Sequence, residues 1–340
     1  MRTTITDIAK ATGFSIATVS MILSGKDRRI SESTREKVLA AAKEMNYRPN
    51  QAAVKLKLGK SQTIGVIIPD ISNSYYASMV KGLEDSCSRR GYSLILCNSQ
   101  DNWDKELDCI STLDSKGIDG LVLCPSANAS NEKLQITIDK LKEIGVPLIQ
   151  TALLPKDSEG SCVTVDSYLG GRLAAEHLCK LGHKDVAIIT GPMYLKPAKD
   201  RVQGFMDVME KYGHPVPEES IISGDYSYEC GLRVAHDVLN TGCTAVFASN
   251  DMVALGLIHA LRREGLRIPE DISVVGYDNI LASGIAEVAL TTISQPVFEL
   301  GASLGTLLCD MIENKVEDPR RIIFEPTLVV RESTGPVPEH

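Results

Sequence analysis

Hydroxyl side chains concentrate in the first twenty residues, where two short helices are expected. They include Thr4, Thr6, Ser15, Thr18 and Ser20. Hydroxyls and backbone amides at helix starts are groups that proteins use to contact phosphate oxygens. Residues 1–60 also carry 12 Lys and Arg against 5 Asp and Glu, a net charge of +7, whereas the remaining residues carry 24 against 39, a net of −15. The basic segment therefore indicates binding to a polyanion, either nucleic acid or an anionic membrane, with the acidic remainder kept away from it.

Catalysis and metal binding are not indicated by the sequence. It contains no GxGxxG, P-loop or HExxH pattern. The nine cysteines form no CxxC pair, and the six histidines form no HxxxH pair. This usage is typical of reduced thiols in the core of a cytoplasmic protein. We therefore expect no enzyme, no metal site and no cofactor.

The N-terminal segment is predicted to fold as three short helices. Thr6 is expected to cap the first, Gly13 allows a tight turn, Ser15 caps the second and Ser31 caps the third. The third helix is expected to bury the apolar side chains Val38, Leu39, Ala42 and Met45. The first two helices have the pattern of a helix-turn-helix, and an ordinary helical hairpin is the alternative. The basic charge of the segment favours the DNA-binding interpretation.

Residues 50–60, NQAAVKLKLGK, separate this headpiece from the rest of the chain. The segment is short and basic, and an isolated helix of this length is unstable in water. We interpret it as a linker that folds only on binding.

From Thr63 onward, short apolar runs alternate with amphipathic helical stretches, a pattern typical of open parallel sheets. The runs are TIGVIIPD, YSLILCNS, IDGLVLCPS, VPLIQTA, VAIITGP, TAVFASND and ISVVGYD. Two batches of such units predict an α/β core of two doubly wound parallel-sheet lobes, with a ligand cleft where the strands end. The predicted divisions are a headpiece at 1–49, a hinge at 50–60 and a core at 61–340, with lobe 1 at 61–161 and 293–324 and lobe 2 at 162–292 and 325–340.

Specific strings of residues resemble the LacI/GalR family of bacterial repressors. The headpiece has the pattern TxxDIAxxxGFSxATVSxxL followed by TREKVLAAAKEMNYRPN. The core continues with NSYY, VDSYLGG, RVQGF, SNDMVALG, VVGYDN and LTTISQP, in the order of the family. The resemblance extends from Ile5 to about Arg331, and it implies a core like that of periplasmic binding proteins.

The resemblance implies a specific way of binding DNA. The second helix would lie in the major groove and read bases with Ile16, Ala17 and Met21. The hinge would pair with its dimer mate and place Leu56 in the minor groove, with Asn50, Ala53 and Lys57 also at the DNA. Where the family often has Arg, this chain has Met21, which cannot make the arginine–guanine contact. The partner is expected to be a pseudo-palindromic double-stranded operator, bound by a homodimer or by a tetramer built from it.

The resemblance also implies an effector site for a sugar or sugar derivative. The matching positions are Tyr76, Asp101, Ser126, Asp166, Arg201, Tyr226, Asn250 and Asp278. Carboxylates and a planar guanidinium can grip paired hydroxyls, and tyrosine rings can stack on a sugar. Asp166 has an alternative role as the cap of the helix that follows it, and Tyr226 as a surface tyrosine. A purine is not expected, because Leu195 and Pro197 replace the Arg and Thr of the family's purine repressors.

Two other functions fit part of the sequence. A solute-binding protein of a transport system would share the core, but it would need export, and neither a secretory h-region nor a membrane span is visible. A regulator that answers a phosphorylated carrier protein fits the whole chain. The expectation is a cytoplasmic transcriptional repressor whose operator affinity is controlled by a small molecule.

Overall fold

The computed structural model divides the chain into two units, Met1–Ser61 and Gln62–His340. It describes residues 3–23, 30–47, 61–126, 131–152, 160–314 and 318–338. The predicted hinge falls outside these ranges, and so do the DNA contacts predicted at Asn50, Ala53, Leu56 and Lys57. Within the ranges, no helix combines the length and apolar character that crossing a bilayer requires.

The described part of the N-terminal unit contains the three predicted helices, α1 (Ile5–Thr12), α2 (Ile16–Leu23) and α3 (Glu32–Glu44). The cap of α1 is Thr4, because its hydroxyl accepts a hydrogen bond from the Asp7 amide and the Asp7 carboxylate accepts one from the Thr4 amide. The prediction of Thr6 as the cap is therefore wrong. Gly13 ends α1 with a φ of 73°, and Ser31 caps α3, both as predicted.

One fully buried side chain from each helix forms the centre of the headpiece, namely Ile8, Val19 and Val38. Ala42 lies one turn after Val38 and is also buried. Leu39, which was predicted to be buried, is 45% exposed. Since adjacent helical positions differ by about 100°, the face that buries Val38 and Ala42 turns Leu39 outward.

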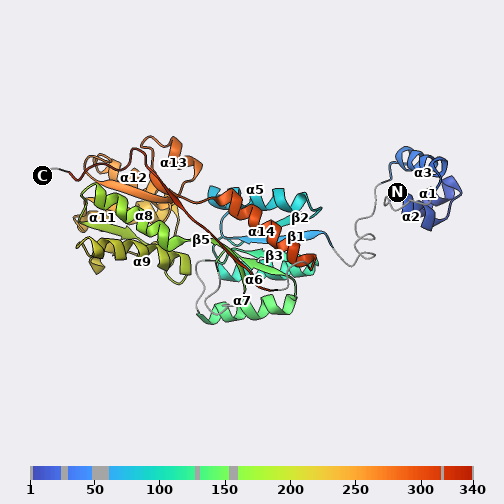
Figure 1. Cartoon of the computed structure of the whole chain (residues 1–340), viewed down its shortest axis with the longest axis horizontal. Coiled ribbons are helices and arrows are strands. Elements are labelled where there is room, and N and C mark those ends of the chain that lie inside the picture. Colours follow the sequence, from blue (N-terminus) through green and yellow to red (C-terminus); the bar gives the residue numbers. More distant parts are fainter. Residues whose placement is uncertain are drawn as a thin grey trace. The chain divides into compact units, whose positions relative to one another are not determined.

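The first lobe of the core is a six-stranded parallel sheet in the order β11-β5-β4-β3-β1-β2. Residues alternate between its faces, so that Ile64, Val66 and Ile68 contact one helical layer and Ile67 the other. Helices α5 and α14 pack side by side on the first face, and α6 and α7 on the second (Figure 1). The elements are β1 (Thr63–Ile68), α5 (Ser74–Ser88), β2 (Ser93–Asn98), α6 (Trp103–Ser115), β3 (Gly120–Leu123), α7 (Asn131–Ile144), β4 (Leu148–Gln150), β5 (Ser161–Val165), α14 (Val297–Ile312) and β11 (Arg321–Phe324).

The second lobe repeats this architecture with the strand order β12-β10-β9-β8-β6-β7. Its pairings are parallel except for β12, which runs antiparallel to β10. Separate apolar clusters on its two faces confirm the doubly wound class. The elements are α8 (Ser167–Lys180), β6 (Val186–Ile189), α9 (Lys196–Lys211), η1 (Glu218–Ser220), β7 (Ile221–Ile222), α10 (Tyr228–Arg233), α11 (Ala235–Asn240), β8 (Ala245–Ala248), α12 (Asp251–Arg263), β9 (Ser273–Asp278), α13 (Leu281–Ile285), β10 (Thr291–Ser294) and β12 (Thr327–Val329).

The chain crosses between the lobes three times. The first crossing follows β5, which belongs to the first sheet through Val165, so it lies later than the predicted division after residue 161. The second follows β10, which belongs to the second sheet through Ser294, so it lies later than the predicted division after residue 292. The third lies between β11 and β12, at 325–326. Because strands belong to a sheet as whole units, each crossing falls in the segment between two strands.

Candidate functional site

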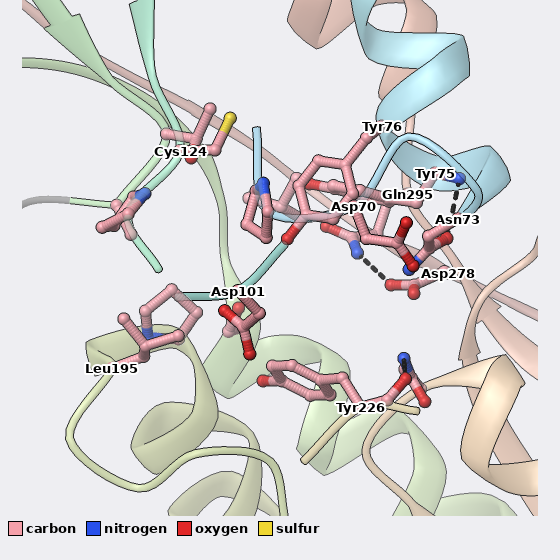
Figure 2. Close-up of a pocket in the computed structure, with 18 of the residues that line it drawn as sticks. Asp70, Asn73, Tyr75, Tyr76, Asp101, Cys124, Leu195, Tyr226, Asp278 and Gln295 are labelled. Carbon is pink, nitrogen blue, oxygen red and sulfur yellow. Dashed lines mark hydrogen bonds between the residues drawn. The ribbon is translucent and has the colours of Figure 1, made fainter. Parts of the chain in front are cut away.

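A cavity of about 340 Å³ lies between the two lobes, at the carboxyl ends of strands from both sheets. Figure 2 shows side chains from both lobes converging on it, with the Tyr76 and Tyr226 rings on opposite sides. Its volume is at the lower end of the range of about 300–1,000 Å³ for small-molecule pockets. Six of the eight predicted effector contacts line it, namely Tyr76, Asp101, Arg201, Tyr226, Asn250 and Asp278.

Arg201 is the cation among the described residues that line this cleft. Arg201 projects from α9 and is only 8% exposed, and its Nη1 donates a hydrogen bond to the Ser249 carbonyl at 2.6 Å. Its guanidinium carbon lies 3.7 Å from the centre of the Tyr277 ring, which places the charge on an aromatic face. Its Nε has no hydrogen-bond partner among the described residues. A buried donor of this kind is costly to leave unpaired, so it fits a ligand oxygen.

Asp278, the last residue of β9, supplies an acidic group to the same cleft. Its Oδ1 accepts a hydrogen bond from Gln295 Nε2 at 2.6 Å, as Figure 2 shows. Burial raises the pKa of Asp278 to about 7, and Asp251 adds to the rise, whereas Arg201 and Gln295 oppose it. Near neutral pH this carboxyl can therefore donate a hydrogen bond as well as accept one.

Three lining residues hold a backbone conformation that side chains rarely adopt. The φ angles are 50° at Asp101, 67° at Tyr226 and 115° at Asp278. Such residues cost of order 1–3 kcal/mol each and cluster at functional sites. Asn250 braces one of them, because its Nδ2 donates to the Tyr226 carbonyl at 2.8 Å while its Oδ1 caps α12. The strain is a reason, independent of residue type, to place a functional site here.

Two predicted effector contacts are absent from the lining. Asp166 caps α8, with its Oδ1 accepting a hydrogen bond from the Leu169 amide at 2.9 Å. Ser126 is 1% exposed, its amide donates to the Glu106 carboxylate at 2.6 Å, and its hydroxyl contacts Ser99 Oγ. Local hydrogen bonds thus occupy both side chains, and neither prediction is supported as a ligand contact.

Other lining residues were not predicted as contacts. Those with polar side chains include Asp70, Asn73, Tyr75, Thr151, Asp225 and Gln295. Several directly follow the first strand, so the rule that ligands bind beyond strand ends would have found them. Leu195 and Pro197 also line the cleft and add an apolar wall.

The headpiece exposes the face of α2 that was predicted to read bases. Ile16 is 50% exposed and Met21 42%, Ala17 is also exposed, and Val19 is fully buried on the opposite face. Thr4, Thr6 and Ser15 are exposed, and Thr18 and Ser20 are half-buried. Ser15 Oγ accepts a hydrogen bond from the Thr18 amide at 3.0 Å, as expected of a cap. All eight contacts predicted in the headpiece lie within the residues that the structure describes.

One pattern in the core resembles a hydrolase nucleophile without being one. Residues 301–305 have the sequence GASLG, which matches GxSxG. They lie inside α14, whereas a nucleophilic serine of that pattern sits at a sharp turn between strand and helix. A Cβ on Gly301 would lie 2.0 Å from the Met79 carbonyl oxygen, so this glycine serves the close packing of α14 on α5.

We expect Asp278→Asn to change how stability depends on pH. The folded-state pKa of about 7 exceeds the ordinary value of 3.8, so between these values the folded chain binds more protons than the unfolded chain. The parent should therefore lose stability as pH rises from about 4 to 7, and Asn removes this loss. The melting temperature of the variant minus that of the parent should increase between pH 5 and pH 8. A difference that stays constant with pH would contradict the burial of this carboxyl.

Comparison with known proteins covers nearly the whole chain. Residues 4–50 match the family model for bacterial regulatory proteins of the lacI family. Residues 61–332 match the model for periplasmic binding proteins and the sugar binding domain of the LacI family. The HTH-type transcriptional regulator DegA of Bacillus subtilis is 35% identical over 341 residues, 99% of each chain. The HTH-type transcriptional repressor PurR of Photorhabdus laumondii is 37% identical, over 97% of this chain and 96% of that protein.

Solved structures agree with these matches. The lac repressor dimer bound to operator and the anti-inducer ONPF superposes with a TM-score of 0.87 at 26% identity, over 98% of this chain and 100% of that one. A complex of the regulator CelR with cellobiose gives 0.73 at 29% identity, over 98% and 100%. An Enterococcus faecium regulator with bound ribose gives 0.71 at 33% identity, over 81% and 99%. The chain belongs to the lacI family of bacterial regulatory proteins and is a DNA-binding transcriptional regulator, not an enzyme.

Proposed function

We propose that this chain is a repressor whose operator affinity is controlled by a sugar or sugar derivative bound between the lobes. The observation that carries the proposal is the buried Arg201 guanidinium, which has an unpartnered Nε and shares the cleft with the Asp278 carboxyl. Each hydroxyl of a polyol can donate and accept, which suits a site that offers both kinds of group. Structural neighbours with bound cellobiose and ribose support the same ligand class.

The charges of the lining favour an uncharged ligand. Its described carboxylates are Asp70, Asp101, Asp225 and Asp278, and its described cation is Arg201. Asp225 is exposed and pairs with Arg233 at 2.9 Å, so the carboxyls that would repel an anionic ligand are chiefly Asp70 and Asp101, together with Asp278 where it is ionised. The proposed effector is therefore a neutral sugar rather than its phosphate. Leu195 and Pro197 offer no side-chain hydrogen bonds that would select a purine.

A thermal-shift panel tests this proposal. Cellobiose, ribose and glucose would be compared with ribose 5-phosphate and glucose 6-phosphate on the purified full chain. A sugar at one hundred times its Kd stabilises the folded chain by about 2.7 kcal/mol, which raises the melting temperature by about 5 °C. We expect at least one neutral sugar to give such a shift and the phosphates to give none. Stabilisation by a phosphate alone would contradict the charge argument, and a panel with no response would contradict these sugars as effectors.

The headpiece is proposed to bind DNA through the predicted positions. Hydroxyls near the starts of α1 and α2 would contact phosphates, and the exposed face of α2 would face the bases. Met21 would contribute an apolar contact, such as one with a thymine methyl group, in place of the arginine–guanine pair. The proposed contacts are Thr4, Thr6, Ser15, Ile16, Ala17, Thr18, Ser20 and Met21, together with the hinge residues Asn50, Ala53, Leu56 and Lys57, which lie outside the described residues.

The chain is proposed to act as a cytoplasmic homodimer. Action on a DNA operator supports the cytoplasmic location. An apolar pair one helical turn apart supports the dimer, because Leu281 is 76% exposed and Ile285 75% exposed on α13. The lac repressor neighbour is a dimer on its operator. Sedimentation of the free chain measures this state directly, and a monomer at the concentrations that bind DNA would contradict it.

A further inference from the structure

A tyrosine hydroxyl joins the two lobes of the core across the cleft. Tyr194 precedes α9 in the second lobe, and its Oη donates a hydrogen bond to the Ser126 carbonyl of the first lobe at 2.7 Å. Neither residue lies in a crossing segment, so this contact depends on how far apart the lobes stand. A change in the separation of the lobes would break it.

Both ends of this hydrogen bond are anchored. Ser126 is fixed because its amide donates to the buried Glu106 carboxylate at 2.6 Å and its hydroxyl donates to Ser99 Oγ at 2.9 Å. Tyr194 lies in a turn in which the Leu195 amide donates to the Pro192 carbonyl at 3.0 Å, directly before α9. Because neither end can adjust freely, the contact fixes the start of α9 against the end of β3.

We propose that Tyr194 is a positioning residue that holds α9, and with it Arg201, at the closed distance from the first lobe. This inference rests on the proposed function of the cleft and adds a control on it. The hydrogen bond raises the population of closed chains, so the ligand meets a site that is already assembled. A protein pre-organised in this way binds its ligand more tightly, because less of the binding free energy is used to bring the lobes together.

Cys124 provides a reporter of closure that needs no ligand. It lines the cleft two residues before Ser126, it is 2% exposed, and its Sγ lies 3.9 Å from Met79 Sδ. Burial raises the pKa of its thiol to about 12, so we expect alkylation to be slow until the cleft opens and exposes it. Cys87 is fully buried in the core of the same lobe and does not line the cleft, so its alkylation reports unfolding of that lobe instead.

The test is iodoacetamide labelling of the full chain with Tyr194→Phe, read at each cysteine by peptide mass spectrometry. Loss of one neutral hydrogen bond should increase the alkylation rate of Cys124 by about two- to tenfold. The rate at Cys87 should stay unchanged, and so should both rates in Tyr212→Phe, which alters an exposed tyrosine at the end of α9. An unchanged rate at Cys124, or an equal rise at Cys87, would overturn the proposal.

A second measurement separates this inference from the function of the cleft. The sugar that gives the largest thermal shift in the panel is added to the parent chain before labelling, and it should protect Cys124. In Tyr194→Phe the same sugar should bind more weakly, and the fold increase of its Kd multiplied by the fold increase of the Cys124 rate should come to about two- to tenfold. A sugar that stabilises the chain without protecting Cys124 would contradict the cleft as its site. Tighter binding of the sugar to the variant than to the parent would contradict the role of Tyr194 while leaving the site in place.

Discussion

Arg201→Ala is expected to reduce the thermal response to every sugar that stabilises the parent chain to about half or less. The variant loses the Nε donor that has no protein partner, and it loses the positive charge that favours ionisation of Asp278. Hydrogen bonds to charged groups contribute about 1.5–3 kcal/mol, so this loss alone weakens binding about 10- to 150-fold. At one hundred times the parent's Kd, the stabilisation by the sugar should therefore fall from about 2.7 kcal/mol in the parent to about 0.3–1.4 kcal/mol in the variant, and the shift in melting temperature should fall in proportion.

Two further variants keep this expectation interpretable. Arg172→Ala removes a half-exposed arginine of the same lobe that pairs with Glu176 at 3.3 Å and does not line the cleft, so its sugar response should equal that of the parent. Arg201→Lys retains a charge but loses the planar guanidinium that lies on Tyr277, so it should keep the fold and bind weakly. If both Arg201→Lys and Arg201→Ala bound the sugar as tightly as the parent, Arg201 would not be a ligand contact.

The architecture of the core could be predicted because its central strands are continuous apolar runs. The run TIGVIIPD contains β1, whose six residues are all buried. A strand that is buried on both faces needs apolar residues at every position, and this makes it visible in the sequence. The short edge strands carry no such signal. Strand β7 has two residues and β11 has four, none of them fully buried in β11, so each apolar run is too short to predict a strand by its pattern. The predicted divisions after residues 161 and 292 fall inside β5 and β10, which have only five and four residues and so give a weak signal of where each strand ends.

The site could be predicted where a side chain has no local hydrogen-bond partner. It could not be predicted where a nearby backbone amide can take the side chain as a helix cap. Arg201 and Asp278 reach the cleft because a buried charge needs a specific partner or ligand. Asp166 has an alternative partner three residues away, the Leu169 amide, and the local contact prevails. Thr4, rather than Thr6, caps α1 because Asp7 completes a reciprocal pair with it. Sequence identifies such a residue as polar and functional, but the choice between a cap and a ligand depends on geometry.

Binding to DNA is expected to weaken steeply as the salt concentration rises. Residues 1–60 carry a net charge of +7, and each phosphate that they neutralise releases a counterion. For a dimer that makes about 6–10 phosphate contacts, affinity should fall about 10³- to 10⁵-fold between about 50 and 200 mM salt. Fluorescence anisotropy with a labelled duplex selected from random DNA would measure this slope, with a scrambled duplex of equal length beside it.

The two duplexes and two lysine variants locate the origin of the effect. Phosphate contacts are common to both duplexes, so both should weaken with salt, whereas base contacts maintain a preference for the selected duplex. Lys10→Gln removes a charge from the exposed surface of α1 and should weaken binding to both duplexes at low salt. Lys180→Gln removes an exposed charge from the acidic core and should leave binding unchanged. An affinity for DNA that does not depend on salt would contradict the headpiece as the DNA-binding surface. A surface of this charge neutralises phosphates and so releases counterions from the DNA, which makes the affinity fall as salt rises.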